Sequence, residues 1–248
     1  MPLKGIEAFL MGDDSTFNKW ESLFLHQILA SMKTVVEKMT FNPFQENTYV
    51  VHDGTSCVII DPGCFKSSEE EYLVNFIESN KLTLVAVLLT HGHLDHIAGL
   101  DFINRKYGVD VYLNETDLPT FNASHLAANL YGLRGFVQPE VPNKLLKGNE
   151  ELVFGDMKFN VINAPGHCIG HVVFHNEEDG YVLNGDVIMK GSHGRTDLPG
   201  GDSATLKRTI LETMFNLPNE TIIYSGHGPE TNVEIEKQTN VVLMGSLG

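Results

Sequence analysis

The segment THGHLDH, residues 90–96, places three histidines and one aspartate within seven positions, directly after the apolar run LTLVAVLL. Imidazole and carboxylate groups are the side chains that bind zinc, iron and manganese in proteins. His91 and His93 are two positions apart, so in extended backbone both side chains point to the same side and can reach one metal ion. Asp95 and His96 then fall on the first turn of the next predicted helix. The segment is therefore predicted to be a metal-binding loop.

Three further loops repeat this design. His167 lies in NAPGHCIGH, Asp186 in VLNGDVI and His227 in IIYSGHG, each at the end of an apolar segment and beside glycine. Glycine permits the tight backbone turns that aim such a side chain inward. The four ligands of one loop cannot complete two metal sites, so these three residues are the candidates for the remaining ligands.

The elements that must position these residues can be predicted from hydrophobic periodicity. LTLVAVLL is continuously apolar and β-branched, which predicts a strand buried on both faces. Open α/β sheets carry their sites at the carboxyl ends of such strands. Strands are expected at 34–41, 47–53, 56–61, 82–89, 109–114, 151–154, 158–164, 171–176, 181–184 and 221–226. Helices are expected at 68–80 with a serine cap, 95–106, 202–216 and 231–240, with a helical excursion and loop over 115–142.

Two strand-rich halves with flanking helices predict one sheet packed on another with helices outside. This is an α/β fold with four layers in the order αββα. The first 33 residues differ from the rest and carry the only tryptophan, Trp20. They lack the basic start, continuous apolar centre and cleavage site of a secretory signal. The sequence therefore predicts an N-terminal extension over 1–33, followed by one domain over 34–248.

Composition narrows the classes of partner. A net charge of −15 opposes binding to nucleic acid and to anionic membrane surfaces. The sequence has no apolar run of the length that a membrane span needs. Cys57, Cys64 and Cys168 are odd in number and widely spaced, which favours reduced thiols in a cytoplasmic protein. The expected partner is a small-molecule substrate, and the sequence leaves the oligomeric state open.

The ordered set THGHLDH, PGHCIGH, NGDV and SGHG resembles the metallo-β-lactamase superfamily of hydrolases over about 34–240. The resemblance implies the αββα sandwich that periodicity also predicts. It implies that one metal ion is held by His91, His93 and His167 and a second by Asp95, His96 and His227. Asp186 would bridge the two ions. Asp61, in IIDPG, and His171 would support the ligands without binding metal.

The resemblance also implies a reaction. Two divalent ions, zinc foremost with iron and manganese as alternatives, would hold a hydroxide that attacks an acyl carbon. Asp95 and Asp186 are accordingly the expected catalytic residues. The sequence offers no convincing serine or cysteine nucleophile for a metal-independent route.

The stretch GRTDLPGGD, residues 194–202, resembles the compact glyoxalase II-like hydrolases, which cleave thioesters such as S-lactoylglutathione. Arg195 stands where classical members have a glutathione-contacting lysine, so it is expected to bind substrate or, alternatively, to pair with a nearby aspartate. Asp197 and Pro229 replace two tyrosines of the classical enzymes, which counts against glutathione as the carrier.

Two alternatives remain open from the sequence. Persulfide dioxygenases share GRTD and the metal-binding loop but use a single iron, and their loop after the third histidine carries a cysteine where this chain has His171. A non-catalytic metal-binding protein of the same fold is the other alternative. Metal content and substrate assays distinguish the three.

Overall fold

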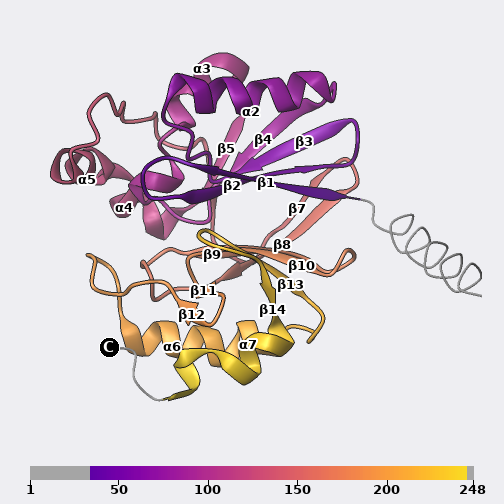
Figure 1. Ribbon diagram of the computed structural model, residues 1–248, viewed down its shortest axis with the longest axis vertical. Helices are drawn as coiled ribbons and strands as arrows, with labels where there is room; N and C mark the ends of the chain where they lie inside the picture. The colour runs from indigo at the N-terminus through magenta and orange to yellow at the C-terminus, as the bar shows by residue number, and fades with distance from the viewer. Residues whose placement is uncertain (1–33, 245–248) are drawn as a thin grey trace, which may run out of the picture. The chain divides into compact units, whose positions relative to one another are not determined.

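The computed structural model describes residues 34–244. The N-terminal extension predicted over 1–33 lies outside the described residues, so the division of the chain into an extension and a domain stays a prediction. Within 34–244, two six-stranded sheets face each other. Figure 1 shows the sheets in the middle of the molecule, with α2 and α3 against one of them and α6 and α7 against the other.

The first sheet has the strand order β1-β2-β3-β4-β5-β6. β1, β2 and β3 are antiparallel neighbours, whereas β3, β4, β5 and β6 run parallel. Its strands are β1 (Val35–Phe41), β2 (Glu46–His52), β3 (Ser56–Ile60), β4 (Thr83–Leu88), β5 (Asp110–Asn114) and β6 (Lys144–Leu146). The helices of this half are α2 (Ser67–Ser79), α3 (Leu100–Tyr107), α4 (Leu118–Asn122) and α5 (Ser124–Tyr131), with short turns η1 (Leu94–His96) and η2 (Glu115–Asp117).

The second sheet has the order β14-β13-β10-β9-β8-β7, and only β10 and β13 are parallel in it among the described strands. Its strands are β7 (Glu151–Phe154), β8 (Met157–Asn163), β9 (Val172–Asn176), β10 (Tyr181–Gly185), β13 (Ile222–Ser225) and β14 (Thr231–Asn232). A small hairpin joins β11 (Ile188–Met189) to β12 (Ser192–His193). The helices are α6 (Ser203–Glu212), η3 (Met214–Asn216), α7 (Val233–Thr239) and η4 (Val241–Met244).

Three apolar layers hold the four structural layers together. Along β3, Cys57 and Ile59 pack toward the helices, while Val58 and Ile60 pack toward the second sheet. The period of two along a strand therefore fills two cores at once. A third core lies between the second sheet and α6 and includes Leu206. The predicted αββα sandwich is confirmed, as is the doubly buried strand β4.

Several element boundaries differ from the sequence prediction. The helix expected over 95–106 is divided into η1 and α3, because the Gly99 N–H donates to the Pro62 carbonyl at 2.8 Å where the chain packs against another loop. The helix expected over 202–216 divides into α6 and η3, and that over 231–240 is the shorter α7 preceded by β14. Lys66, not a serine, is the N-cap of α2, and Glu69 accepts its N–H at 3.2 Å.

No helix within residues 34–244 is long and apolar enough to cross a membrane. Cys57, Cys64 and Cys168 are all buried and none of the three forms a disulfide. Burial raises the pKa of the Cys57 thiol to about 12, so this side chain is a protonated part of the core.

Candidate metal centre

The loop after β4 is tied to the end of β3. Asp61 accepts the N–H of Thr90 at 2.7 Å and its hydroxyl at 2.6 Å. The same hydroxyl lies 2.9 Å from Nδ1 of His91. Asp61 itself has φ of 51°, a left-handed conformation that asparagine and aspartate adopt more readily than most residues. The carboxylate thus fixes the first turn of the loop and the ring of its first histidine.

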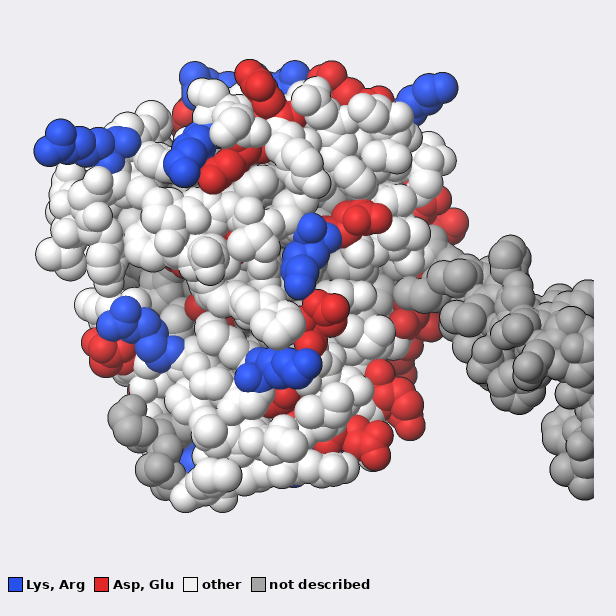
Figure 2. Space-filling model, in the orientation of Figure 1, with Lys and Arg blue, Asp and Glu red and all other residues white. Residues whose placement is uncertain are grey.

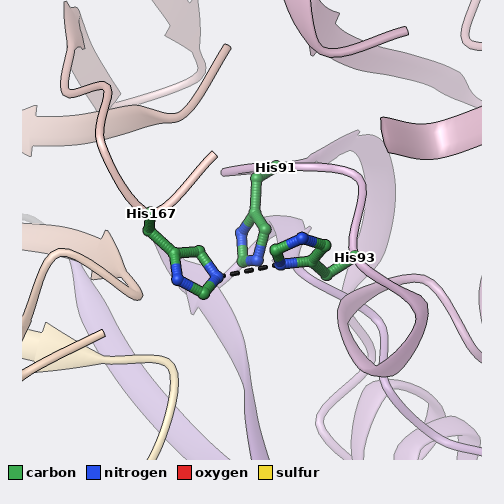
Figure 3. A group of neighbouring side chains, drawn as sticks. All are labelled: His91, His93 and His167. Carbon is green, nitrogen blue, oxygen red and sulfur yellow. Dashed lines mark hydrogen bonds between the residues drawn. The ribbon is translucent and has the colours of Figure 1, made fainter. Parts of the chain in front are cut away.

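His91, His93 and His167 form the first cluster of candidate ligands. Their ligand atoms lie within 4.8 Å of one another. Figure 3 shows the three rings converging, His91 and His93 from one loop and His167 from another. Nδ1 of His93 is 2.8 Å from Nε2 of His167. The structure thus brings together residues 74 positions apart, for which the family resemblance implies one shared metal ion.

Asp95, His96 and His227 form the second cluster, again with ligand atoms within 4.8 Å of one another. Nε2 of His227 is 3.2 Å from Oδ2 of Asp95, and Nε2 of His96 is 3.8 Å from the same oxygen. Gly226 leaves room for Asp186 beside this cluster, because a Cβ at position 226 would lie 2.3 Å from Oδ1 of Asp186. A larger residue at position 226 would therefore displace the carboxylate of Asp186.

Asp186 lies between the two clusters. Its Oδ2 is 3.5 Å from Nε2 of His167, in the first cluster, and 3.6 Å from Nε2 of His227, in the second. Its Oδ1 is 3.5 Å from Nε2 of His96. One carboxylate therefore faces both groups of ligands, which is the position that a bridging ligand needs.

Several imidazoles are held through Nδ1, which leaves Nε2 directed into the centre. Nδ1 of His167 is 2.7 Å from the Arg195 carbonyl oxygen, and Nδ1 of His96 is 3.0 Å from Oδ2 of Asp61. Nδ1 of His227 is 3.3 Å from the Gln45 carbonyl oxygen. A partner on the far nitrogen fixes the tautomer and the ring orientation of metal-binding histidines. Histidines of both clusters have such a partner.

His171 supports Asp186 and belongs to neither cluster. Its Nε2 accepts the backbone N–H of Asp186 at 3.1 Å, and its ring stacks on His91 with centroids 4.7 Å apart. Burial lowers the pKa of His171 well below its usual range, so the ring is neutral and Nε2 can accept. The family resemblance implied that His171 supports the ligands, and the group that it bonds is the backbone N–H of Asp186.

Burial also keeps two histidines of the first cluster neutral. It lowers the pKa of His91 well below its usual range and that of His93 to about 4. A buried imidazolium loses its hydration, which is why the neutral form is favoured. Neutral imidazole is the form that binds a metal ion through its lone pair.

Negative charge accumulates around the second cluster. Burial alone would raise the pKa of Asp95, but His96 and His227 outweigh it and lower that pKa. Burial likewise opposes charge on His96, yet Asp95, Asp186 and Asp61 raise its pKa well above the usual range. Carboxylates gathered around buried imidazoles favour a bound cation.

Orphaned polar atoms test whether these residues suit metal ions. Eight buried side-chain atoms have no hydrogen-bond partner within the described part of the chain, and Nε2 of His91, Nε2 of His96 and Oδ1 of Asp186 are three of them. Buried polar atoms are normally satisfied, and leaving one unpaired is costly. All three belong to the predicted ligand set. The residues present therefore fit divalent metal ions.

Two buried carboxyl groups at the centre were missed by the sequence reasoning. Asp117 accepts the N–H of Gly92 at 2.6 Å and that of Gly170 at 3.2 Å, so it joins the loops that carry His93 and His167. Glu46 is completely buried, and its backbone pairs with that of His227. Neither residue lies in a ligand-like motif, and no signal in a single sequence distinguishes them from surface acids.

Arg195 lies at the rim of the centre. Its guanidinium makes two hydrogen bonds of 2.7 Å with Asp197, and both side chains are more than half exposed. Of the two roles expected for Arg195, the structure therefore contains the pairing with a nearby aspartate. The backbone carbonyl of Arg195 has the separate task of holding His167.

A cavity of about 890 Å³ opens onto the centre and includes His93, Asp95, His167, Asp186 and His227 in its wall. His193 also lines it, and Nδ1 of this residue lies 2.8 Å from the Gly194 carbonyl oxygen. A substrate in the cavity would contact both clusters. The side chains are thus arranged as ligands at the end of a pocket.

Comparison with known proteins agrees with the fold. A family model described as the metallo-beta-lactamase superfamily matches residues 41–227. The chain is 37% identical to the probable metallo-hydrolase YqgX of Bacillus subtilis, across 84% of this chain and 97% of that protein. It is 34% identical to the hydroxyacylglutathione hydrolase GloC of Haemophilus influenzae, with the same two coverages of 84% and 97%.

A solved structure gives the same result. The crystal structure of TTHA1623 in a di-iron-bound form superposes with a TM-score of 0.75 and 38% identity, covering 83% of this chain and 98% of that one. The family model spans more than half of the chain, from the end of β1 to the last candidate ligand. The two facing sheets, the convergent ligand loops and these similarities together show that the chain belongs to the metallo-β-lactamase superfamily.

Proposed function

We propose that this protein is a metal-dependent hydrolase that cleaves an acyl thioester of the S-lactoylglutathione type, using two divalent metal ions. The observation that carries the proposal is the position of Asp186, whose carboxylate faces both clusters of ligands. A site for one metal ion would need only one of the clusters. A shared carboxylate is what two adjacent ions require.

The residues divide into three groups. His91, His93 and His167 would hold one ion, Asp95, His96 and His227 would hold the other, and Asp186 would bridge them. Bound there, the ions would acidify a water to provide the nucleophile and would stabilise negative charge on the carbonyl oxygen. Thr90 and Asp61 orient the first loop, and His171 holds the backbone of Asp186.

The thioester is the finer part of the proposal. The similarity to GloC, a hydroxyacylglutathione hydrolase, supports it, as does the stretch GRTDLPGGD. The reaction adds water across the acyl–sulfur bond and releases a carboxylic acid and a thiol. Zinc is the first choice of metal, with iron and manganese as alternatives, because donors of this kind suit all three ions. We also infer a cytoplasmic location from the three buried free thiols, and a small molecule as the partner.

Metal content and hydrolysis measured on one sample test the proposal. The purified chain, loaded separately with zinc, iron or manganese, is expected to bind about two ions and to release free thiol from S-lactoylglutathione. A chain that binds one iron and consumes oxygen with glutathione persulfide would instead be a persulfide dioxygenase. Two bound ions without hydrolysis of any thioester would favour the non-catalytic alternative.

A further inference from the structure

The cavity over the candidate metal centre is mostly apolar away from the ligands. One side is formed by α4 and α5, and the other by the loop that includes Leu198 and Pro199. Phe44 and Tyr131 also line it, with their ring centroids 5.6 Å apart and nearly perpendicular. Ligand pockets usually combine an apolar wall with a few polar groups that orient the ligand. The polar groups here are concentrated at the metal-ligand end.

The wall built by α4 and α5 is anchored to the ligand loop. The Ser124 hydroxyl donates to the Gly92 carbonyl at 2.8 Å, and Leu94 packs against Ala128 in a small apolar cluster. Both contacts join α5 to the segment that carries His93 and Asp95. The apolar wall is therefore fixed relative to the candidate ligands.

The rim of the cavity exposes large apolar side chains. Leu126, Leu130 and Ile169 have exposed fractions of 61%, 80% and 55%. All three line the cavity. Figure 2 shows few charged side chains over α4 and α5, the part of the surface that forms this side of the cavity. Exposed apolar side chains that gather at a cavity mark a binding surface more often than scattered ones do.

The cavity offers little to an anionic ligand. Among the described residues that line it, Arg195 is the one lysine or arginine. Its guanidinium is already bonded to both carboxylate oxygens of Asp197. A charged carrier such as glutathione would have to displace this pairing to gain a cationic contact.

We propose that the cavity binds the apolar acyl chain of a thioester whose thiol carrier is small and uncharged. This inference rests on the proposed thioesterase function and differs from it in the preferred substrate, so S-lactoylglutathione should be hydrolysed more slowly than a neutral thioester with an apolar acyl chain. In the reaction, water supplies the oxygen of the new carboxylic acid, the carbon–sulfur bond breaks, and the thiolate takes up a proton to leave as a thiol. The acyl chain lies between α5 and the loop at 198–200, with its carbonyl at the ligand end.

The first test compares acyl chain lengths on one neutral carrier. The probes are the acetyl, butanoyl, hexanoyl and octanoyl thioesters of N-acetylcysteamine, hydrolysed by the metal-loaded protein. Each buried methylene contributes about 0.8 kcal/mol, which is about a fourfold rise in kcat/KM per carbon. The octanoyl thioester of glutathione is expected to be no better a substrate than its N-acetylcysteamine counterpart. A flat or falling series, or a strong preference for glutathione, would overturn the inference.

Variants then connect the chain-length dependence to this cavity. Leu130→Asp places a charge in the apolar wall at a position exposed enough to tolerate it, and should reduce the increase per carbon. Val153→Asp is the matched control, because Val153 is 59% exposed on β7 and does not line the cavity. The control should keep the increase of the unmodified protein. Equal loss in both variants would count against the assignment.

A binding measurement separates failure of this inference from failure of the proposed function. S-alkyl-N-acetylcysteamine thioethers cannot be hydrolysed, and calorimetry on the metal-free protein reports their affinity alone. Affinity should rise from S-ethyl to S-octyl with a negative heat-capacity change, and Leu130→Asp should weaken it. Chain-length-dependent binding without hydrolysis of any thioester would overturn the proposed function and keep the apolar ligand. No dependence on chain length would overturn the inference itself.

Discussion

At the scale of single residues, the arrangement of the two clusters depends on one carboxylate, Asp186, and on the histidine bonded to its backbone, His171. Asp186 faces His96, His167 and His227, which belong to both clusters. His171 holds the backbone N–H of Asp186. The bridging position thus depends on a side chain that is not itself a candidate ligand.

Asp186→Asn should abolish hydrolysis and leave the fold intact. An amide has nearly the same size but is neutral and can bind metal through only one oxygen, so the shared contact is lost. Activity should fall by several orders of magnitude and about one metal ion per chain should be lost. Thioesterase rate, metal content and circular dichroism on one sample provide the check. A folded variant with near-native turnover and two ions would exclude the dinuclear arrangement.

Glu46 provides a residue-scale test of the electrostatics. Burial raises its pKa well above the ordinary 4.5. At a pH between 4.5 and the raised pKa, Glu46 is ionised in the unfolded chain but still protonated in the folded chain. The free energy of unfolding therefore falls as the pH rises through this interval. Glu46→Gln removes this titration. The free energy of unfolding of Glu46→Gln, minus that of the unmodified protein, should therefore increase with pH above 4.5, by up to about 1.4 kcal/mol per pH unit.

Chemical denaturation of both proteins in a chelator, from pH 4 to pH 8, measures the difference. At pH 4 both side chains are neutral, so the two free energies of unfolding should differ least there. A difference independent of pH would mean that Glu46 is ionised in the folded protein.

At the scale of elements, the site depends on loops that follow strands of different sheets and on the short turn between them. Asp117 ends η2 and accepts backbone N–H groups from Gly92 and Gly170. Gly170 has no room for a side chain, since a Cβ there would lie 2.3 Å from the Asp117 N atom. The turn η2 therefore sets the spacing of the loops that carry His93 and His167.

Asp117→Asn should weaken metal binding at the first cluster without unfolding the protein. The substitution leaves one acceptor oxygen where two are needed, so one loop loses its anchor. Residues that support metal ligands typically contribute 10–100-fold in metal affinity or activity. Competition with a chromophoric chelator measures the affinity. Glu236→Gln is the control, since Glu236 is equally buried but bonds Gly191 and Thr231, away from the ligands. Equal losses in both variants would indicate general destabilisation.

At the scale of the whole molecule, the centre joins the two halves of the sandwich. Four of the seven candidate ligands, His91, His93, Asp95 and His96, follow β4 of the first sheet. The other three, His167, Asp186 and His227, follow β8, β10 and β13 of the second. Between the sheets, Phe159 and Phe174 are completely buried in the shared core. Metal binding should therefore stabilise the packing of one sheet on the other.

Removal of metal should lower the melting temperature. A site occupied at a thousandfold above its Kd adds about 4 kcal/mol to the free energy of unfolding. For a domain of this size, each kilocalorie per mole shifts the melting temperature by about 2–4 °C, so chelation should lower it by about 8 °C or more. Calorimetry before and after chelation checks this. Asp186→Asn should show a smaller difference, and an unchanged melting temperature would mean that the ions do not link the sheets.

The sequence by itself determined ten of the strands and the candidate ligands that follow them, and it missed β6, β11, β12 and β14, which have only two or three residues each. Apolar runs and alternation are local properties, so β4 and its metal-binding loop could be predicted without tertiary contacts. The order of THGHLDH, PGHCIGH, NGDV and SGHG then indicated the family and the αββα layers. Helix boundaries were less accurate, because the break before α3 depends on packing against the loop at Pro62 and Cys64.

Only the tertiary structure decided how these parts meet. Asp186 lies between the clusters because the carboxyl ends of β10 and β13 are neighbours in one sheet and face β4 of the other. Asp117 and Glu46 became visible as parts of the centre, and Arg195 was found paired with Asp197. The segment 115–142, which carried no chemical motif, supplies α4 and α5 as the apolar wall. Contacts of this kind join residues far apart in the chain, and periodicity contains no information about them.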